Sequence, residues 1–129
     1  ILLLNAYRLT QNKQYLVHAV SNLDYLLGRN ATGYSFVTGA GSKPIMHPHH
    51  RPSVADGVTE PVPGLLSGGP NPGRQDKCQY EFTEAETAFT DHDCSYASNE
   101  IAINWNAPLV YLASAIEALQ GELRIKNEK

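Results

Sequence analysis

The chain of 129 residues has no excess of basic residues and no long run of apolar side chains. It carries 10 Lys and Arg against 13 Asp and Glu, a formal net charge of −3. A nucleic-acid partner is therefore not expected, because such partners are bound through clustered positive charge. No apolar run approaches the roughly 20 residues that a bilayer-spanning helix needs, so a membrane partner is not expected either.

A start signal is also missing. The sequence opens on the apolar stretch Ile1–Tyr7, which resembles the back half of a helix, with neither an initiator Met nor a basic segment and cleavage site before it. The length suits one domain. We expect these residues to be part of a longer polypeptide.

Cysteine is scarce, since the chain contains only Cys78 and Cys94. They are either a disulfide or two free thiols. A bridge would close a loop of about 17 residues and contribute about 3 kcal/mol on the loop-entropy model. It would also imply an oxidising compartment.

Apolar residues at helical spacing predict three helices, over residues 1–10, 13–27 and 99–119. Asn12 suits the N-cap of the second helix, and Gly28 suits the position just past its end. The third helix contains Pro108, which predicts a distorted first half. Trp105 lies on the same apolar face of this predicted helix as aliphatic residues. A position in the core is therefore favoured over a role as an aromatic platform that stacks on sugars.

Residues 31–98 differ from these helical stretches in composition. Eight of the ten glycines and seven of the eight prolines fall between Gly33 and Gly73, which excludes a long helix there. The segment also carries enough aromatic and aliphatic residues to be pinned onto a scaffold rather than disordered. An irregular surface over a rigid scaffold is a common setting for a functional site.

Three histidines and an arginine are concentrated in the segment His47-Pro-His-His-Arg-Pro52. Together with His92 and the cysteines they offer metal ligands, but this spacing is not a usual zinc arrangement, and Arg51 disfavours a nearby cation. Imidazole and guanidinium groups on a proline-stiffened loop can instead donate hydrogen bonds to hydroxyls and stack on a sugar face. Substrate contact is favoured, with a zinc hydrolase and an exposed polar loop as alternatives.

The stretch from Phe89 to Ala107 contains the leading catalytic candidate. Asp91 and Asp93 precede a Ser98-Asn-Glu100 step at the predicted start of the last helix. A carboxyl group at that position, following a long loop, suits a general acid. Taken alone, however, Ser98 and Glu100 are more typical of an ordinary helix N-terminus, where the helix dipole favours a carboxylate.

Five stretches of the sequence match one known pattern in order. They are Tyr25-Leu-Leu-Gly-Arg-Asn30, Gly33-Tyr-Ser-Phe-Val-Thr-Gly39, His47-Pro-His-His-Arg-Pro52, Gly68-Gly-Pro-Asn71 and Ser98-Asn-Glu-Ile-Ala-Ile-Asn-Trp-Asn-Ala-Pro108. Together they resemble the C-terminal part of the catalytic domain of glycoside hydrolase family 9, the family of cellulases and related β-1,4-glucanases. The resemblance runs from about residue 4 to residue 119 and includes both signatures of that region.

The resemblance implies an all-α fold, a partial (α/α)6 barrel of six helical hairpins. This chain would supply the last few helices and their long irregular connecting loops. We expect residues 1–121 to belong to the catalytic domain and residues 122–129 to form a charged tail that frays. An incomplete barrel leaves apolar helix faces uncovered, so we expect the piece to self-associate.

The resemblance also assigns roles to residues. Glu100 stands where the family has its general acid, and His49 and Arg51 where it has sugar contacts. Asp91 and Tyr96 match the second signature and are expected to shape the surroundings of the acid. Asp91 is predicted with Glu100 as a catalytic residue, and Tyr96 is predicted as a substrate-binding residue. The substrate-binding set also includes His50, at a less specific position of the pattern.

Inverting glycosidases need a protonated carboxylic acid and a separate carboxylate that activates water. The family's base lies in an Asp-Ala-Gly-Asp motif, which does not occur here. We therefore expect a secreted, endo-acting β-1,4-glucanase whose base is not on this chain and which is inactive in isolation. Xylan, xyloglucan and mixed-linkage glucan are alternative substrates, and a non-catalytic glycan-binding piece is a further alternative.

The resemblance implies no required cofactor. Family members often carry structural calcium, for which Asp91 and Asp93 are the candidate ligands.

Overall fold

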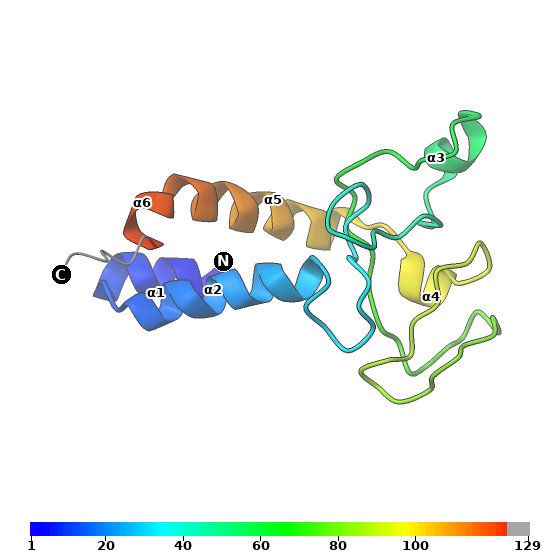
Figure 1. The fold of residues 1–129 in the computed structure, drawn as a ribbon, viewed down its shortest axis with the longest axis horizontal. Coiled ribbons are helices and arrows are strands. Elements are labelled where there is room, and N and C mark those ends of the chain that lie inside the picture. The colour runs from blue at the N-terminus through cyan, green and yellow to red at the C-terminus, as the bar shows by residue number, and fades with distance from the viewer. Residues whose placement is uncertain (124–129) are drawn as a thin grey trace.

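The computed structural model describes residues 1–123, and this part of the chain contains helices and irregular segments but no β-strand. Figure 1 shows an elongated molecule in which the long helices gather at one end and mostly irregular chain lies at the other. The helices are α1 (Leu2–Thr10), α2 (Lys13–Leu26), α3 (Arg51–Ala55), α4 (Tyr96–Asn99), α5 (Ile103–Ala118) and α6 (Gln120–Leu123).

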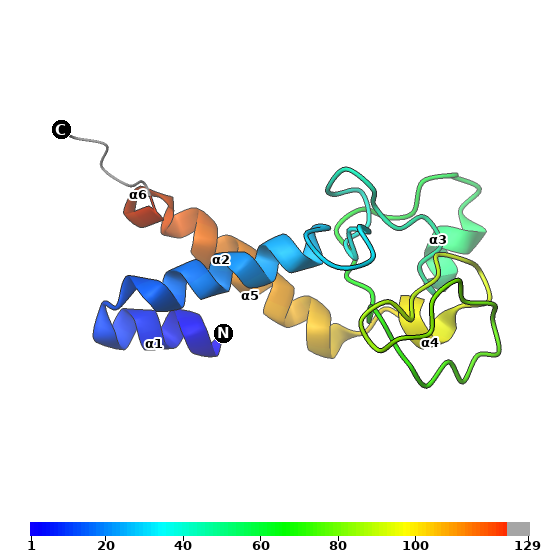
Figure 2. The same cartoon turned by 60° about the horizontal axis from the view of Figure 1, so that its bottom comes forward.

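The predicted N-terminal helices are confirmed, and they form a hairpin. Gln11 ends α1 in the left-handed conformation, with φ 58°. Asn12 then caps α2 as predicted, because its side-chain oxygen accepts the Gln14 N–H at 3.0 Å. Gly28, with φ +115°, follows the end of α2. Figure 2 shows α5 crossing α2, which it contacts.

The third helix begins later than predicted, at Ile103 rather than Asn99. Ser98 and Asn99 belong to the short helix α4, and Glu100 follows it in an extended conformation with φ −60° and ψ 140°. The interpretation of Glu100 as a first-turn acid of the last helix is therefore wrong. Backbone pairing outside any helix holds this segment, since the Glu100 carbonyl accepts the Gly68 N–H at 3.1 Å.

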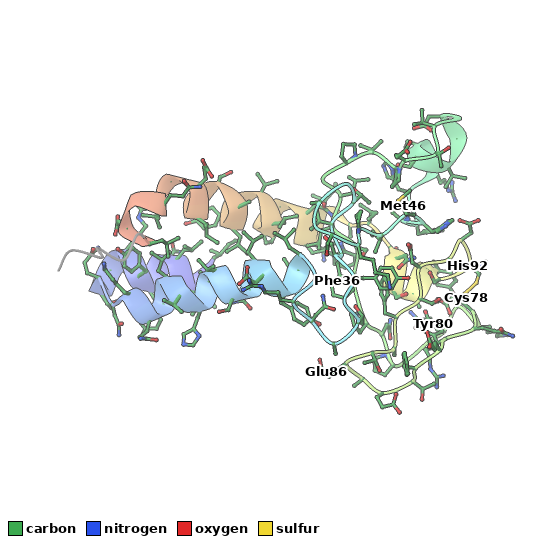
Figure 3. All side chains as sticks on the ribbon, viewed as in Figure 1. Phe36, Met46, Cys78, Tyr80, Glu86 and His92 are labelled. Carbon is green, nitrogen blue, oxygen red and sulfur yellow. A yellow bond between two sulfur atoms is a disulfide. The ribbon has the colours of Figure 1, made fainter. Side chains whose placement is uncertain are left out.

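Phe36 lies at the junction of the helical half and the loop half (Figure 3), and it is 1% exposed. It packs with Ile45, Phe89 and Leu109 in a core that draws on both halves. Trp105 packs against this cluster and donates its indole N–H to the Leu66 carbonyl at 2.9 Å. Trp105 is half-buried, so it packs against the core, as predicted, at its edge.

A second cluster joins the three long helices. Leu4 and Tyr7 of α1 and Leu16 and Ala19 of α2 are buried together, and α5 covers them with Leu112 and neighbouring side chains. α5 is one helix through Pro108. Among the described residues, none of the helices has the length and apolar character to cross a bilayer.

The irregular segment is pinned to this scaffold, as its apolar content predicts. The Leu66 N–H donates to the Asn106 side-chain oxygen at 2.8 Å, and the Asn106 amide donates back to the Leu66 carbonyl at 3.0 Å. Gly69 has φ +81°, and a Cβ there would stand 3.6 Å from the Phe36 ring. The positive φ favours glycine at this turn, whereas a Cβ at that distance would make only an ordinary van der Waals contact with the ring.

Cys78 and Cys94 are joined in a disulfide, which resolves the choice between a bridge and free thiols. The predicted tail overlaps α6 at Glu122 and Leu123. Residues 124–129, where the rest of that tail falls, lie outside the described residues.

Candidate functional site

Glu100 lies beside His49 although the two residues are far apart in the sequence. They form an isolated parallel backbone bridge. Both side chains are exposed. In such a bridge paired residues point to the same side, so the carboxyl group and the imidazole share one face of the loop surface. The structure thus brings together the predicted acid and a predicted sugar contact.

Asn99 connects the two segments and is fully buried. Its carbonyl accepts the His49 N–H at 2.8 Å, and its side-chain amide donates to the His47 carbonyl at 2.9 Å. Asn99, which directly precedes Glu100, therefore holds the histidine segment next to the segment that carries the acid. Sequence reasoning missed this role because both partners are distant in the chain and no local pattern marks them.

Asp91 holds the same histidine segment from its other end. Its two oxygens accept the Met46 N–H at 2.8 Å and the His47 N–H at 2.9 Å. A carboxylate bonded to two backbone N–H groups is a strong, directed anchor. This geometry is that of a residue that shapes the site, and within residues 1–123 Asp91 makes no hydrogen bond to Glu100.

Arg51 begins α3 and is exposed. It lines a hollow of about 480 Å³ together with His49, His50, Asp93 and neighbouring apolar side chains. The hollow is large enough for a sugar ring and carries groups that bind hydroxyls. Glu100 is not among the lining residues, so the carboxyl group stands outside this hollow.

His50 and Tyr96 make specific contacts within the protein. The His50 Nδ1 lies 2.9 Å from the Ser53 hydroxyl oxygen, which also accepts the Val62 N–H at 3.0 Å. The Tyr96 ring is tilted by 53° against the His49 ring, with centroids 6.0 Å apart. Tyr96 therefore supports a predicted sugar contact, whereas His50 helps to fold the turn at α3.

Asp76 is a further carboxylate of the site region that sequence reasoning missed. It accepts hydrogen bonds from the Cys78 N–H at 3.0 Å, the Tyr80 hydroxyl at 2.7 Å and the Ala97 N–H at 3.0 Å. Burial alone raises the pKa of Asp76, but these hydrogen bonds outweigh it and hold the pKa below its ordinary value. The Asp-Lys-Cys spacing, typical of an Asx turn, signals only the first of these bonds.

The structure shows what the metal ligands considered from sequence contact, and a calcium site at Asp91 or Asp93 stays a prediction. Each Asp91 oxygen accepts one backbone N–H, and the Asp93 Oδ1 lies 2.7 Å from the His47 Nδ1. Within residues 1–123, Cys78, His92 and Cys94 form the one group of three potential ligands. Its sulfurs are bonded to each other and cannot act as thiolates.

The chain is similar in sequence to enzymes named for the glucans or glucan fragments that they cleave. The chain is 53% identical over 117 residues to a xyloglucan-specific endo-β-1,4-glucanase of Bacteroides ovatus, covering 91% of this chain and 20% of the relative. It is 39% identical over 120 residues to a cellodextrinase of Butyrivibrio fibrisolvens, covering 90% and 22% respectively. The chain thus spans about a fifth of the length of these relatives.

Solved structures and a family model agree with the sequence relatives. A Bacteroides ovatus family 9 structure matches with a TM-score of 0.80 and 49% identity, over 91% of this chain and 20% of that one. A metagenome-derived family 9 endoglucanase matches with a TM-score of 0.79 and 46% identity, over 87% and 20%. The model described as glycosyl hydrolase family 9 matches residues 1–113. The chain therefore belongs to glycosyl hydrolase family 9.

Proposed function

We propose that residues 1–129 form the C-terminal part of the catalytic domain of an endo-acting, inverting β-1,4-glucanase in which Glu100 is the general acid. Glu100 gives its proton to the leaving glycosidic oxygen as the bond to the anomeric carbon breaks. Water attacks that carbon from the opposite face and gives its proton to a carboxylate base supplied by a part of the domain outside this chain. The domain is an (α/α)6 barrel, of which these helices are the last.

The pairing of Glu100 with His49 is the observation that carries this proposal. It presents an exposed carboxyl group beside an imidazole that can bind sugar hydroxyls, at the loop end of a helical scaffold. The hollow next to it, lined by Arg51 and His50, gives a neighbouring sugar ring a place to bind.

The substrate class is a β-1,4-linked plant polysaccharide. Xyloglucan ranks with cellulose as a candidate, because the relative that is 53% identical is a xyloglucan-specific enzyme. Xylan and mixed-linkage glucan remain the other candidates. The protein is proposed to act outside the cytoplasm, an assignment that the Cys78–Cys94 disulfide supports, since such bridges persist in oxidising compartments.

The test is the stereochemistry of the first product formed by the full-length gene product. Purified enzyme is incubated with xyloglucan, carboxymethylcellulose, mixed-linkage glucan and xylan, and the new reducing ends are followed by proton NMR. We expect α-anomers to appear first on at least one of the glucans, because inversion at a β-linkage gives the α-configuration. Initial β-anomers would contradict inversion, and binding without turnover would favour the non-catalytic alternative.

We further propose that the isolated 129-residue chain self-associates through its helical half. Leu2, Leu9 and Ile103 are 84%, 86% and 86% exposed, and they have no cover among the described residues. A hollow of about 390 Å³ between α1 and α5 is lined almost entirely by apolar groups, including Leu4 and Leu119. Exposed apolar surface of this kind favours association.

Sedimentation velocity over a range of concentrations checks this prediction. The wild-type chain should form dimers or larger species, and replacement of Leu9 and Ile103 by Lys should shift it toward monomer. Replacement of the exposed polar residue Gln14 by Lys is the matched control and should change nothing. A wild-type chain that stays monomeric at the highest concentration contradicts self-association.

A further inference from the structure

Asp76 lies behind the segment that carries Glu100. Its Oδ2 accepts the N–H of Ala97, 21 positions later in the sequence, at 3.0 Å. Ala97 belongs to α4, a helix of four residues that ends directly before Glu100. A single turn of helix has almost no stability of its own, so its orientation depends on outside contacts.

The other hydrogen bonds to the α4 backbone are with uncharged groups. The Asn99 carbonyl accepts the His49 N–H, and the Ser98 carbonyl accepts the Gly69 N–H at 2.9 Å. The Asn71 amide donates to the Ala97 carbonyl at 3.0 Å. Asp76 adds the one charge-assisted bond to the α4 backbone among the described residues, and such bonds are about twice as strong as neutral ones.

Asp76 is itself held firmly. Its Oδ1 accepts the N–H of Cys78, whose sulfur is bridged to Cys94 just before α4. Its Oδ2 also accepts the Tyr80 hydroxyl at 2.7 Å. Figure 3 shows Cys78 and Tyr80 on the same side of α4. The carboxylate therefore connects a cross-linked loop to the backbone of the acid-bearing segment.

From these contacts we infer that Asp76 is a positioning residue that orients Glu100 for proton donation. The inference rests on the proposed role of Glu100 as general acid. Loss of the Asp76 bond to Ala97 lets α4 tilt, and Glu100 moves away from the leaving oxygen. Because proton donation depends on hydrogen-bond geometry, a displacement near 1 Å costs about 100-fold in rate.

The test compares two leaving groups in the full-length gene product. Natural glucan needs a proton on its leaving oxygen, whereas 2,4-dinitrophenyl β-cellobioside releases a stable anion and needs little proton donation. Asp76→Ala should lower kcat on the glucan about 10- to 100-fold, with little change in KM, because the substrate contacts are intact. On the dinitrophenyl substrate kcat should change by less than about threefold.

Three further variants keep the test decisive if Asp76→Ala folds poorly. Tyr80→Phe removes one bond to the carboxylate and should give a smaller effect of the same kind, and Asp76→Asn should be intermediate. Asp24→Asn changes a carboxylate in α2, remote from α4, and is the matched control. Equal losses on both substrates, or no loss on the glucan, would overturn the positioning role.

Glu100→Gln in the same pair of assays separates this inference from the proposed function. If Glu100→Gln discriminates between the leaving groups and Asp76→Ala does not, Asp76 has only a structural role and Glu100 remains the acid. If Glu100→Gln does not discriminate, the proposed general acid is wrong, and the role of Asp76 is overturned with it.

Discussion

Replacement of Glu100 by Gln in the full-length gene product should lower kcat on natural glucan by about 10²- to 10⁴-fold, the usual contribution of a general acid. Gln keeps the size of the side chain and its hydrogen-bonding capacity but has no acidic proton to give. KM should change little, because the groups that line the proposed sugar-binding hollow, such as Arg51 and His49, are untouched. Initial rates on xyloglucan and carboxymethylcellulose provide the measurement.

The control for this experiment is Glu117→Gln, which makes the same chemical change on an exposed position of α5. It should leave kcat within about twofold, because surface substitutions away from a site are close to neutral. Glu100→Gln should also unfold at the same urea concentration as the wild type, since Glu100 is exposed. A kcat within tenfold of the wild type would contradict the assignment of Glu100 as the acid.

Replacement of Asp91 by Ala should destabilise the 129-residue chain by about 1 to 3 kcal/mol, because two charge-assisted hydrogen bonds to backbone N–H groups are lost. The donors are the backbone N–H groups of Met46 and His47. Once released, the histidine segment is free to move away from Glu100. Urea unfolding followed by circular dichroism gives the free-energy change.

Asp93→Ala is the matched control, since Asp93 is a neighbouring carboxylate that bonds only the exposed side chain of His47. Its removal should cost less than about 1 kcal/mol, as for other exposed ion pairs. In the full-length gene product, Asp91→Ala should raise KM and lower kcat on both natural and dinitrophenyl substrates. A loss confined to the natural substrate would instead assign Asp91 a direct part in proton transfer.

The helical half was largely predictable from sequence because its signals are local. Apolar spacing placed the helices, and the Asn12 cap and the turn at Gly28 fixed the ends of α2 to within a residue. The shared helix face of Trp105 and aliphatic residues is enough to predict that Trp105 packs against the core. These features depend on neighbours within one or two helical turns, which the sequence displays directly.

The backbone conformation of Glu100 and the residues that hold it were less predictable, because their contacts join residues that are far apart in the sequence. Local sequence preference predicts Glu100 in a helix, but the hydrogen bond from Gly68 and the bridge to His49 hold its backbone in an extended conformation. Asp91 meets Met46 across 45 positions, and Asp76 meets Ala97 across 21. No periodicity marks such partners. The role of Glu100 came from the family resemblance and remains a prediction.

The bridge between His49 and Glu100 also sets where this chain can change its length. Successive residues of an extended segment point to opposite faces, so adding or deleting one residue between Ser98 and Ile101 would turn the carboxyl group away from the imidazole. The exposed turn 56–60 has no such register to keep. Length variation among natural homologues should therefore accumulate in that turn and be absent from the four residues around the acid.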